Sequence, residues 1–201
     1  MKKYEAVLIL NPNLSSKVDE FKTEFNQLLS ENSFKTIVDK IHYIRWGTPI
    51  DDFYFRCCIG INGLTKNKIE GDGKTPIGSF KIGDLYFRKE RIELPETDLK
   101  CVRIKSTYGW CDDVTKPNKY NKLIKITKSI HHEKLFRNDS KYDLLIPIKY
   151  NSKKRIVGKG SCIFLHLTKN YKPTAGCIAL KLKDFLIMLK IINKKTLIRI
   201  H

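Results

Sequence analysis

Residues 164–180, FLHLTKNYKPTAGCIAL, place a histidine and a cysteine in two apolar runs on either side of a polar loop. Each run has the length of a strand, and Pro173 and Gly176 in the loop are typical of turns. The sequence therefore predicts a hairpin-like pair of strands that brings His166 and Cys177 together. Two interpretations are open at this point: two core residues beside a turn, or a cysteine nucleophile with its general base.

The spacing of the two residues sets a geometric condition. His166 and Cys177 are 11 residues apart, and an extended chain of that length would separate them by up to about 35 Å. A reversal in the loop is therefore required before they can share a cleft. Gly176 permits an unusual backbone angle beside the thiol. The backbone N–H groups of Gly176 and Cys177 are the predicted oxyanion hole.

The rest of the chain after residue 50 is dominated by short β-rich runs separated by turn residues. These runs lie at residues 53–61, 79–87, 99–105, 122–126, 142–150 and 195–200. Residues 182–193, LKDFLIMLKIIN, are the exception and predict a helix with Asp184 in its first turn. Many short strands and little helix predict a mainly β domain, built as a sandwich or barrel.

The beginning of the chain has a different pattern. Residues 4–10 predict a strand, residues 34–44 predict another, and between them large apolar side chains recur at helical spacing, at Val18, Phe21, Phe25, Leu28 and Leu29. This β-α-β unit resembles the opening of the small-subunit ribosomal protein six family, which also has a Tyr-Glu strand before a long helix. We interpret residues 1–35 as an N-terminal extension.

Charge and hydropathy limit the partners. The net charge of +18, from 39 basic and 21 acidic residues, favours anionic partners. The lysines are scattered along the chain, which does not favour nucleic acid as the partner. No apolar run approaches the roughly 18 residues of a membrane span. The apolar run near the start is shorter than the about 7–15 residues of a secretory signal, so no signal peptide is recognised.

Six cysteines are present, and no two of them form a CxxC pair, so a zinc site is not predicted. A chain of this length does not need disulfides for stability. We interpret the cysteines as free thiols. Those other than Cys177 are expected to be mostly buried and inert: Cys57, Cys58, Cys101, Cys111 and Cys162.

Residues 158–180, GKGSCIFLHLTKNYKPTAGCIAL, resemble the active-site segment of the L,D-transpeptidase catalytic domain family, the YkuD-like proteins. The family pattern is an apolar strand ending in His, a loop, Ser or Thr, one residue, Gly, Cys and an apolar strand. The matching residues are His166, Thr174, Gly176 and Cys177. The resemblance covers about residues 50–200 because other segments agree in order: a Thr-Pro-x-Gly-x-Phe turn at 75–80, YGWCDD at 108–113 and HHEKLFRNDSKYDLLI at 131–146. The PTAGC motif is favoured by one subgroup.

The resemblance implies an L,D-transpeptidase-like β-sandwich or barrel over residues 36–201, with one helix near the C-terminus. It implies acyl transfer on peptidoglycan stem peptides through a thioester on Cys177, with His166 as general base and acid. An amine acceptor would give transpeptidation, whereas water would give L,D-carboxypeptidase activity. No metal or cofactor is implied.

Two positions depart from the family pattern. Many members have His before the Gly and Arg two residues after the Cys, where this chain has Ala175 and Ala179. Another group must then hold the substrate carboxylate, and Arg137 is the predicted replacement. Three further residues are predicted to line the same cleft or, alternatively, to form a surface ion-pair network: His132, Glu133 and Asp139. Thr174, from the loop that precedes Cys177, is also predicted to bind substrate.

Other functions remain open from the sequence. The chain could be a non-catalytic basic module that binds RNA or cell-wall polymer, or another cysteine hydrolase. A transpeptidase would act in the periplasm or cell envelope, while the lack of a recognisable signal peptide leaves a cytoplasmic location open. The oligomeric state is not indicated.

Overall fold

The computed structural model describes residues 6–7, 42–47 and 52–201. The helix predicted around residues 18–29 and most of the predicted β-α-β extension lie outside these residues. So does the predicted domain boundary at residue 35.

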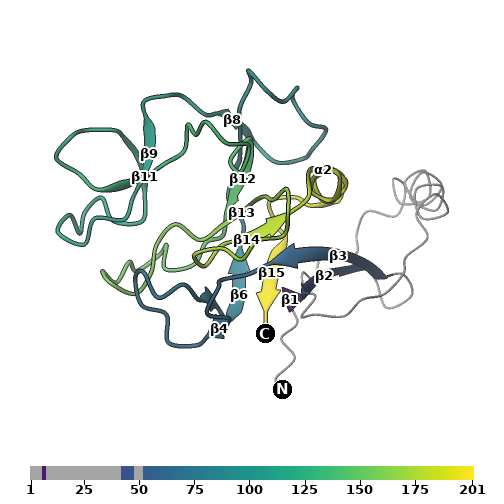
Figure 1. Ribbon diagram of the computed structural model, residues 1–201, viewed down its shortest axis with the longest axis horizontal. Coiled ribbons are helices and arrows are strands. Elements are labelled where there is room, and N and C mark those ends of the chain that lie inside the picture. Colours follow the sequence, from purple (N-terminus) through teal and green to yellow (C-terminus); the bar gives the residue numbers. More distant parts are fainter. Residues whose placement is uncertain (1–5, 8–41, 48–51) are drawn as a thin grey trace.

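A seven-stranded sheet is the centre of the fold (Figure 1). Its strand order is β2-β3-β14-β13-β12-β7-β8. The bounds of these strands, in chain order, are β2 His42–Gly47, β3 Asp52–Cys58, β7 Leu85–Phe87, β8 Cys101–Arg103, β12 Leu144–Pro147, β13 Phe164–Leu167 and β14 Ile178–Leu180.

Three smaller sheets surround the central one. Their strand orders are β1-β15-β6, β10-β9-β11 and β4-β5. The bounds are β1 Ala6–Val7, β4 Leu64–Thr65, β5 Thr75–Pro76, β6 Gly78–Lys81, β9 Tyr108–Cys111, β10 Leu123–Lys125, β11 His132–Lys134 and β15 Leu197–Ile200. The described part of the chain is thus mainly β, as predicted.

The hairpin predicted for residues 164–180 is wrong in one respect, because β13 and β14 are parallel neighbours. The loop between them must therefore carry the chain from the end of β13 back to the level at which β13 begins, whereas a hairpin turn would only reverse its direction. The register pairs Leu165 with Ile178 and His166 with Ala179. Cys177 therefore comes immediately before β14, beside the beginning of β13.

One predicted strand is divided in two. Residues 79–87 form β6 and β7, which belong to different sheets. The chain changes sheet near Gly83, whose backbone N–H donates to the carbonyl of Pro147. A continuous apolar run does not reveal such a change, because both halves have the composition of a strand.

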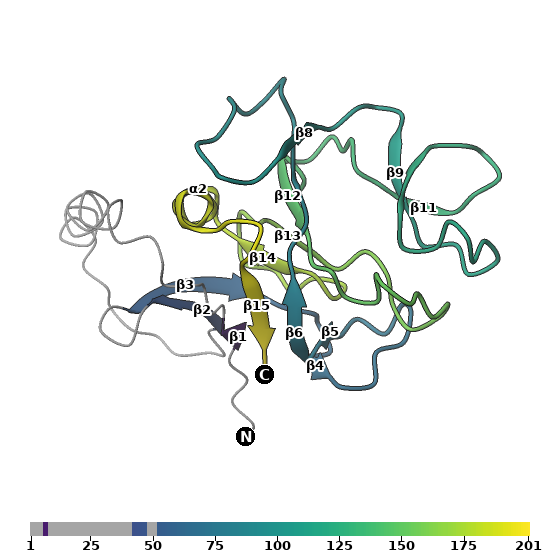
Figure 2. The same cartoon turned by 180° about the vertical axis from the view of Figure 1, so that it is seen from behind.

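The central strands are covered on both faces. On one face Leu144, Ile146 and Leu165 belong to a large aliphatic cluster, while on the other face Leu145 and Phe164 belong to an aromatic cluster. Figures 1 and 2 show helix α2 on one side of β12 and β13 and the small sheet of β9 and β11 on the other. Burial on both faces explains why these strands are apolar at nearly every position.

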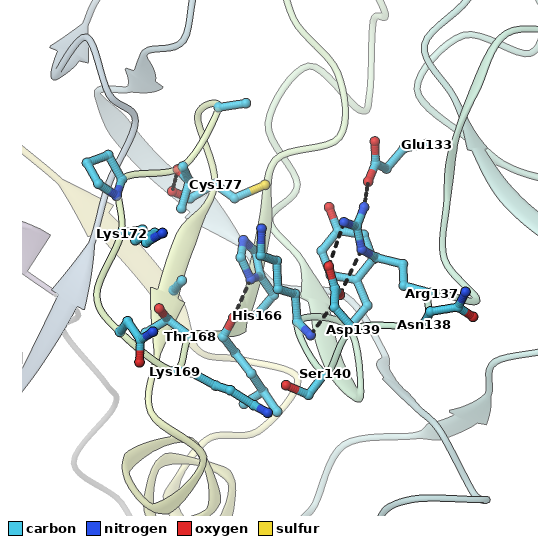
Figure 3. Close-up of a pocket in the computed structure, with 18 of the residues that line it drawn as sticks. Glu133, Arg137, Asn138, Asp139, Ser140, His166, Thr168, Lys169, Lys172 and Cys177 are labelled. Atoms are coloured by element: carbon cyan, nitrogen blue, oxygen red, sulfur yellow. Dashed lines mark hydrogen bonds and ion pairs between the residues drawn. The ribbon is translucent and has the colours of Figure 1, made fainter.

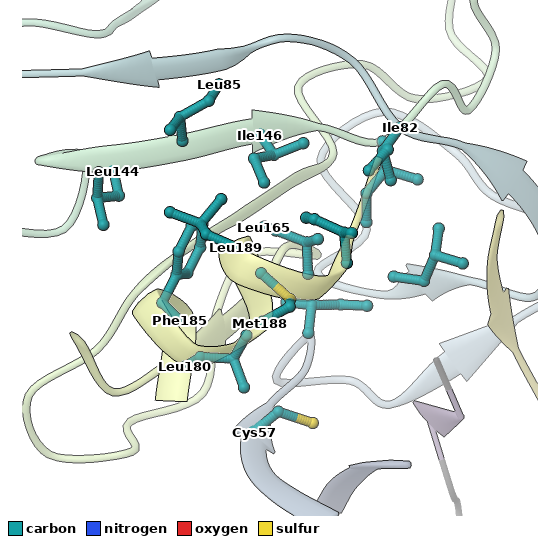
Figure 4. Close-up of a cluster of buried hydrophobic side chains, with 14 of the residues drawn as sticks. Cys57, Ile82, Leu85, Leu144, Ile146, Leu165, Leu180, Phe185, Met188 and Leu189 are labelled. Atoms are coloured by element: carbon teal, nitrogen blue, oxygen red, sulfur yellow. The ribbon is translucent and has the colours of Figure 1, made fainter. Parts of the chain in front are cut away.

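Helix α2, Leu182–Ile191, completes the aliphatic cluster and confirms the predicted C-terminal helix. Phe185, Met188 and Leu189 point from the helix to the strands (Figure 4). Asp184 in the first turn and Lys190 in the last turn complement the helix dipole. Among the described residues no helix is long and apolar enough to cross a bilayer.

The contact between α2 and the sheet should contribute to the stability of the domain. Phe185 is fully buried, so Phe185→Ala removes apolar contacts and leaves a cavity, and should lower the free energy of unfolding by about 3–5 kcal/mol. Leu182 on the same helix is 40% exposed, and Leu182→Ala is the matched control. Urea denaturation of the two variants measures the difference; equal losses would contradict this packing.

Candidate active site

A cavity of about 700 Å³ lies between two segments of the chain, residues 133–142 and residues 166–179. Figure 3 shows Cys177 and His166 on one wall, facing Glu133, Arg137 and Asp139 on the other. The loop between β13 and β14 thus forms one wall, and the segment leading into β12 forms most of the other.

The parallel register places the two predicted catalytic side chains on the same face of the sheet. His166 lies opposite Ala179, and Cys177 is two residues before Ala179, so all three side chains point to one side. Both His166 and Cys177 line the cavity. The structure therefore brings the predicted pair into one cleft.

The hydrogen bond of the His166 ring defines its tautomer. Nδ1 lies 2.9 Å from the carbonyl oxygen of Leu167, which can only accept, so Nδ1 carries the proton. The other ring nitrogen, Nε2, keeps its lone pair and can accept a proton. Burial lowers the pKa of His166 to about 4, which keeps the ring neutral near pH 7.

The Cys177 thiol is held by two backbone groups. Sγ donates to the carbonyl of Cys162 at 3.1 Å and accepts from the N–H of Phe164 at 3.4 Å. Burial raises the pKa of the thiol to about 12, against a smaller opposite effect of the Phe164 N–H. The resting pair is therefore a neutral thiol and a neutral imidazole, and no thiolate is preformed near pH 7.

The loop before the nucleophile is closed by Thr174. The hydroxyl of Thr174 donates to the carbonyl of Cys177 at 2.6 Å and accepts from the N–H of Gly176 at 3.1 Å. Of the two predicted oxyanion-hole donors, the Gly176 N–H is thus already engaged inside the loop. The Cys177 N–H is the other predicted donor, and it forms no hydrogen bond with a described residue.

Gly176 is required at its position. Its φ of +139° is strained for a residue with a side chain, and a Cβ there would lie 2.8 Å from the carbonyl oxygen of Lys74. The segment that contains Lys74 therefore packs directly against the backbone of the loop between β13 and β14, residues 168–177, which is called the nucleophile loop after the predicted role of Cys177.

Arg137 lines the cavity but is already paired. Its Nε and Nη2 donate to the two carboxylate oxygens of Asp139 at 3.0 and 2.8 Å, and Nη1 donates to Glu133 at 3.0 Å. The hydrogen bonds from Arg137 lower the pKa of Asp139 to about 2. The predicted cleft position and the alternative ion-pair network are thus both present. A substrate carboxylate would have to share or displace these contacts.

Lysines at the cavity supply positive charge without such pairing. Lys141, Lys169 and Lys172 line it, and none of the three ammonium groups forms an ion pair with a described residue. These side chains were not singled out from the sequence, because a scattered lysine carries no motif.

His132 is placed differently from the prediction. It is not among the described residues that line the cavity. Its ring packs against Gly109 of β9, so closely that a Cβ added to Gly109 would lie 2.5 Å from the ring. Nδ1 donates to the carbonyl of Ile130 at 2.7 Å, and the buried Nε2 has no hydrogen-bond partner among the described residues. His132 therefore packs within the small sheet β10-β9-β11.

Tyr142 was missed by the sequence reasoning. It is buried, lines the cavity and packs edge-on against the His166 ring with centroids 5.3 Å apart. It also lies beside the Arg137 guanidinium, 5.1 Å from its ring centroid. The residue lies within the segment 131–146 that resembles the family, which is the signal that could have identified it.

The other cysteines follow the prediction in part. All six cysteines are free. Cys57, Cys58 and Cys111 are buried, whereas Cys101 and Cys162 are partly exposed. Cys101 begins the edge strand β8, and Cys162 lies just before β13 and packs against the aromatic cluster.

A thiol and a neutral imidazole that line one cavity are the two groups that a cysteine nucleophile and its general base require. The chain belongs to the L,D-transpeptidase catalytic domain family: the model of that family, YkuD, matches residues 37–200. It is thus a member of an enzyme family that acts on peptidoglycan peptides. The comparisons with curated proteins and with solved structures gave no match.

The neutral state of the pair predicts how Cys177 alkylation depends on pH. Because the thiol pKa is raised to about 12, the rate of iodoacetamide labelling should be low at pH 7 and rise about tenfold per pH unit up to pH 10. Peptide mass spectrometry separates Cys177 from the other cysteines. His166→Gln should leave this slope unchanged, whereas a plateau near neutral pH that the variant abolishes would indicate a preformed ion pair.

Burial of neutral His166 also predicts a pH dependence of stability. Between the folded pKa of about 4 and the unfolded value of about 6.5, the unfolded chain binds more protons, so the free energy of unfolding rises with pH. This contribution, at most about 3 kcal/mol, is present above pH 6.5 and lost as pH falls through 4. Urea denaturation of the wild type and His166→Gln between pH 4 and 7 isolates it; parallel profiles would contradict the assignment.

Proposed function

We propose that this protein transfers acyl groups of peptidoglycan stem peptides through a thioester on Cys177. The observation that carries the proposal is the shared cavity of Cys177 and His166 within a chain of the L,D-transpeptidase family. The bond attacked is the amide between an L-centre and a terminal D-residue, as the family resemblance implies.

The first half-reaction uses the neutral pair. His166 Nε2 accepts the thiol proton as Sγ attacks the amide carbonyl carbon, which gives a tetrahedral oxyanion. The Cys177 N–H stabilises this oxyanion. The intermediate collapses, the C–N bond breaks, and the protonated His166 returns the proton to the leaving amine, which departs as the free D-amino acid. The product is a thioester on Cys177.

The second half-reaction repeats these steps with a new nucleophile. An amine acceptor loses a proton to His166 and attacks the thioester, so that a new amide forms and the thiol is restored. Water in place of the amine gives L,D-carboxypeptidase activity at the same site.

The charge of the cavity supports an anionic peptide substrate. Lys141, Lys169 and Lys172 attract carboxylates to the entrance. Arg137, which the sequence suggested as the carboxylate ligand, is held by Glu133 and Asp139, so this cluster adds no net positive charge and the lysines carry the electrostatic argument. Since stem peptides lie outside the cytoplasm, we propose the cell envelope as the site of action.

Mass spectrometry of the intact protein incubated with a tetrapeptide stem tests the proposal. The expected result is a tripeptide adduct on Cys177, lost in Cys177→Ala and formed about 10²- to 10⁴-fold more slowly in His166→Gln. Dimeric peptide in the presence of an amine acceptor would indicate transpeptidation, and tripeptide alone would indicate carboxypeptidase activity. Binding of cell-wall polymer or RNA with no adduct would instead support a non-catalytic module.

A further inference from the structure

Thr75 connects two parts of the chain that are far apart in sequence. It lies in β5 and is fully buried. Its hydroxyl donates to the carbonyl of Gly176 at 2.8 Å and accepts from the N–H of Gly60 at 2.8 Å. Both hydrogen-bonding directions of this hydroxyl are therefore committed, one of them to the residue before the nucleophile.

The hydrogen bond from Thr75 to the Gly176 carbonyl fixes the orientation of the whole peptide group between Gly176 and Cys177. The Gly176 carbonyl and the Cys177 N–H belong to the same planar peptide group, and in a trans peptide they point in opposite directions. When Thr75 holds the carbonyl on the buried side, the N–H must point away from Thr75. Thr75 thus determines the direction of the one predicted oxyanion donor that the loop itself does not use.

The surrounding backbone leaves little freedom for this peptide group. A Cβ on Gly60 would lie 2.4 Å from the carbonyl oxygen of Gly73, and one on Gly176 would lie 2.8 Å from that of Lys74. Thr174 is also held between backbone groups, since its N–H donates to Ile59 at 2.9 Å. The backbone of the segment that ends in Thr75 is therefore in close contact with the nucleophile loop.

We propose that Thr75 is a positioning residue for acyl transfer, which aims the Cys177 N–H at the oxyanion by holding the Gly176 carbonyl. The inference rests on the proposed thioester chemistry at Cys177. Thr75 itself is not among the described residues that line the cavity, so it acts through the peptide group and not on the substrate.

This role can be separated from a general effect on the thiol. Acylation of Cys177 by an ester passes through a tetrahedral oxyanion, which needs the N–H donor. Alkylation by iodoacetamide displaces iodide at a saturated carbon and forms no oxyanion. A defect in the aim of the N–H should therefore slow acylation alone, whereas damage to the thiol or its loop should slow both reactions.

The experiment compares both reactions in the same variants, with p-nitrophenyl acetate as acyl donor and peptide mass spectrometry of Cys177 as readout. Thr75→Val keeps the shape of the side chain and removes the hydroxyl. It should slow acylation about 10- to 100-fold, less than the 10²–10³ for outright loss of a donor, while alkylation changes less than about twofold. Thr75→Ser restores the hydroxyl and should recover acylation.

Thr196→Val is the matched control. Thr196 is also buried, and its hydroxyl accepts from the N–H of Asn193 at 2.9 Å, away from the nucleophile loop. This variant should leave the ratio of acylation to alkylation unchanged. Thermal melting of all variants compares their stabilities, and Thr75→Ala replaces Thr75→Val in the same comparison if the valine variant does not fold.

Two outcomes overturn the inference. If Thr75→Val acylates at the wild-type rate, the hydroxyl does not position the donor. If acylation and alkylation fall by the same factor, Thr75 only maintains the loop. The ester is not a stem peptide, so a wild type that reacts with p-nitrophenyl acetate but not with the tetrapeptide would contradict the proposed function and leave the Thr75 comparison intact.

Discussion

The parallel pairing of β13 with β14 is the constraint on which the site depends. It places His166 opposite Ala179 and therefore on the same face as Cys177. Because both strands lie inside the central sheet and are buried on both faces, neither can shift without exposing apolar side chains. A shift of one residue would turn the side chain of His166 or Cys177 toward the aliphatic core. The hydrophobic core thus maintains the geometry of the pair.

Burial also sets the chemistry of that pair. The same low-dielectric surroundings that stabilise the strands disfavour charge, which raises the thiol pKa and lowers the imidazole pKa. The pair is consequently uncharged at rest, and in the proposed reaction the proton transfer accompanies attack on the substrate. Such a site needs fixed dipoles near the developing oxyanion. The chain has one such candidate in the Cys177 N–H, whose peptide group is held by buried Thr75.

This chain lacks the arginine of the family motif beside the nucleophile and has an arginine within an ion-pair network on the opposite wall of the cavity. Where many family members have an arginine after the nucleophile, this chain has Ala179 and a cluster of Arg137, Glu133 and Asp139 on the facing segment. The Arg137 guanidinium donates hydrogen bonds to both carboxylates, so it is held rigidly and has a structural role. Lys141, Lys169 and Lys172, which line the cavity and form no ion pair with a described residue, are then better placed to attract a carboxylate, although flexible ammonium groups orient it less strictly than a guanidinium.

Local patterns in the sequence were sufficient for the mainly β fold, the helix after residue 181, the shared cavity of His166 and Cys177 and the family, because these depend on neighbouring residues and on one motif. The tertiary structure alone decided the parallel direction of the two site strands and the division of residues 79–87 between two sheets. It also decided that Arg137 is paired, that His132 faces the small sheet, and that Thr75 contacts a loop 101 residues away. These features depend on contacts between distant segments, which a single sequence does not encode in any local pattern.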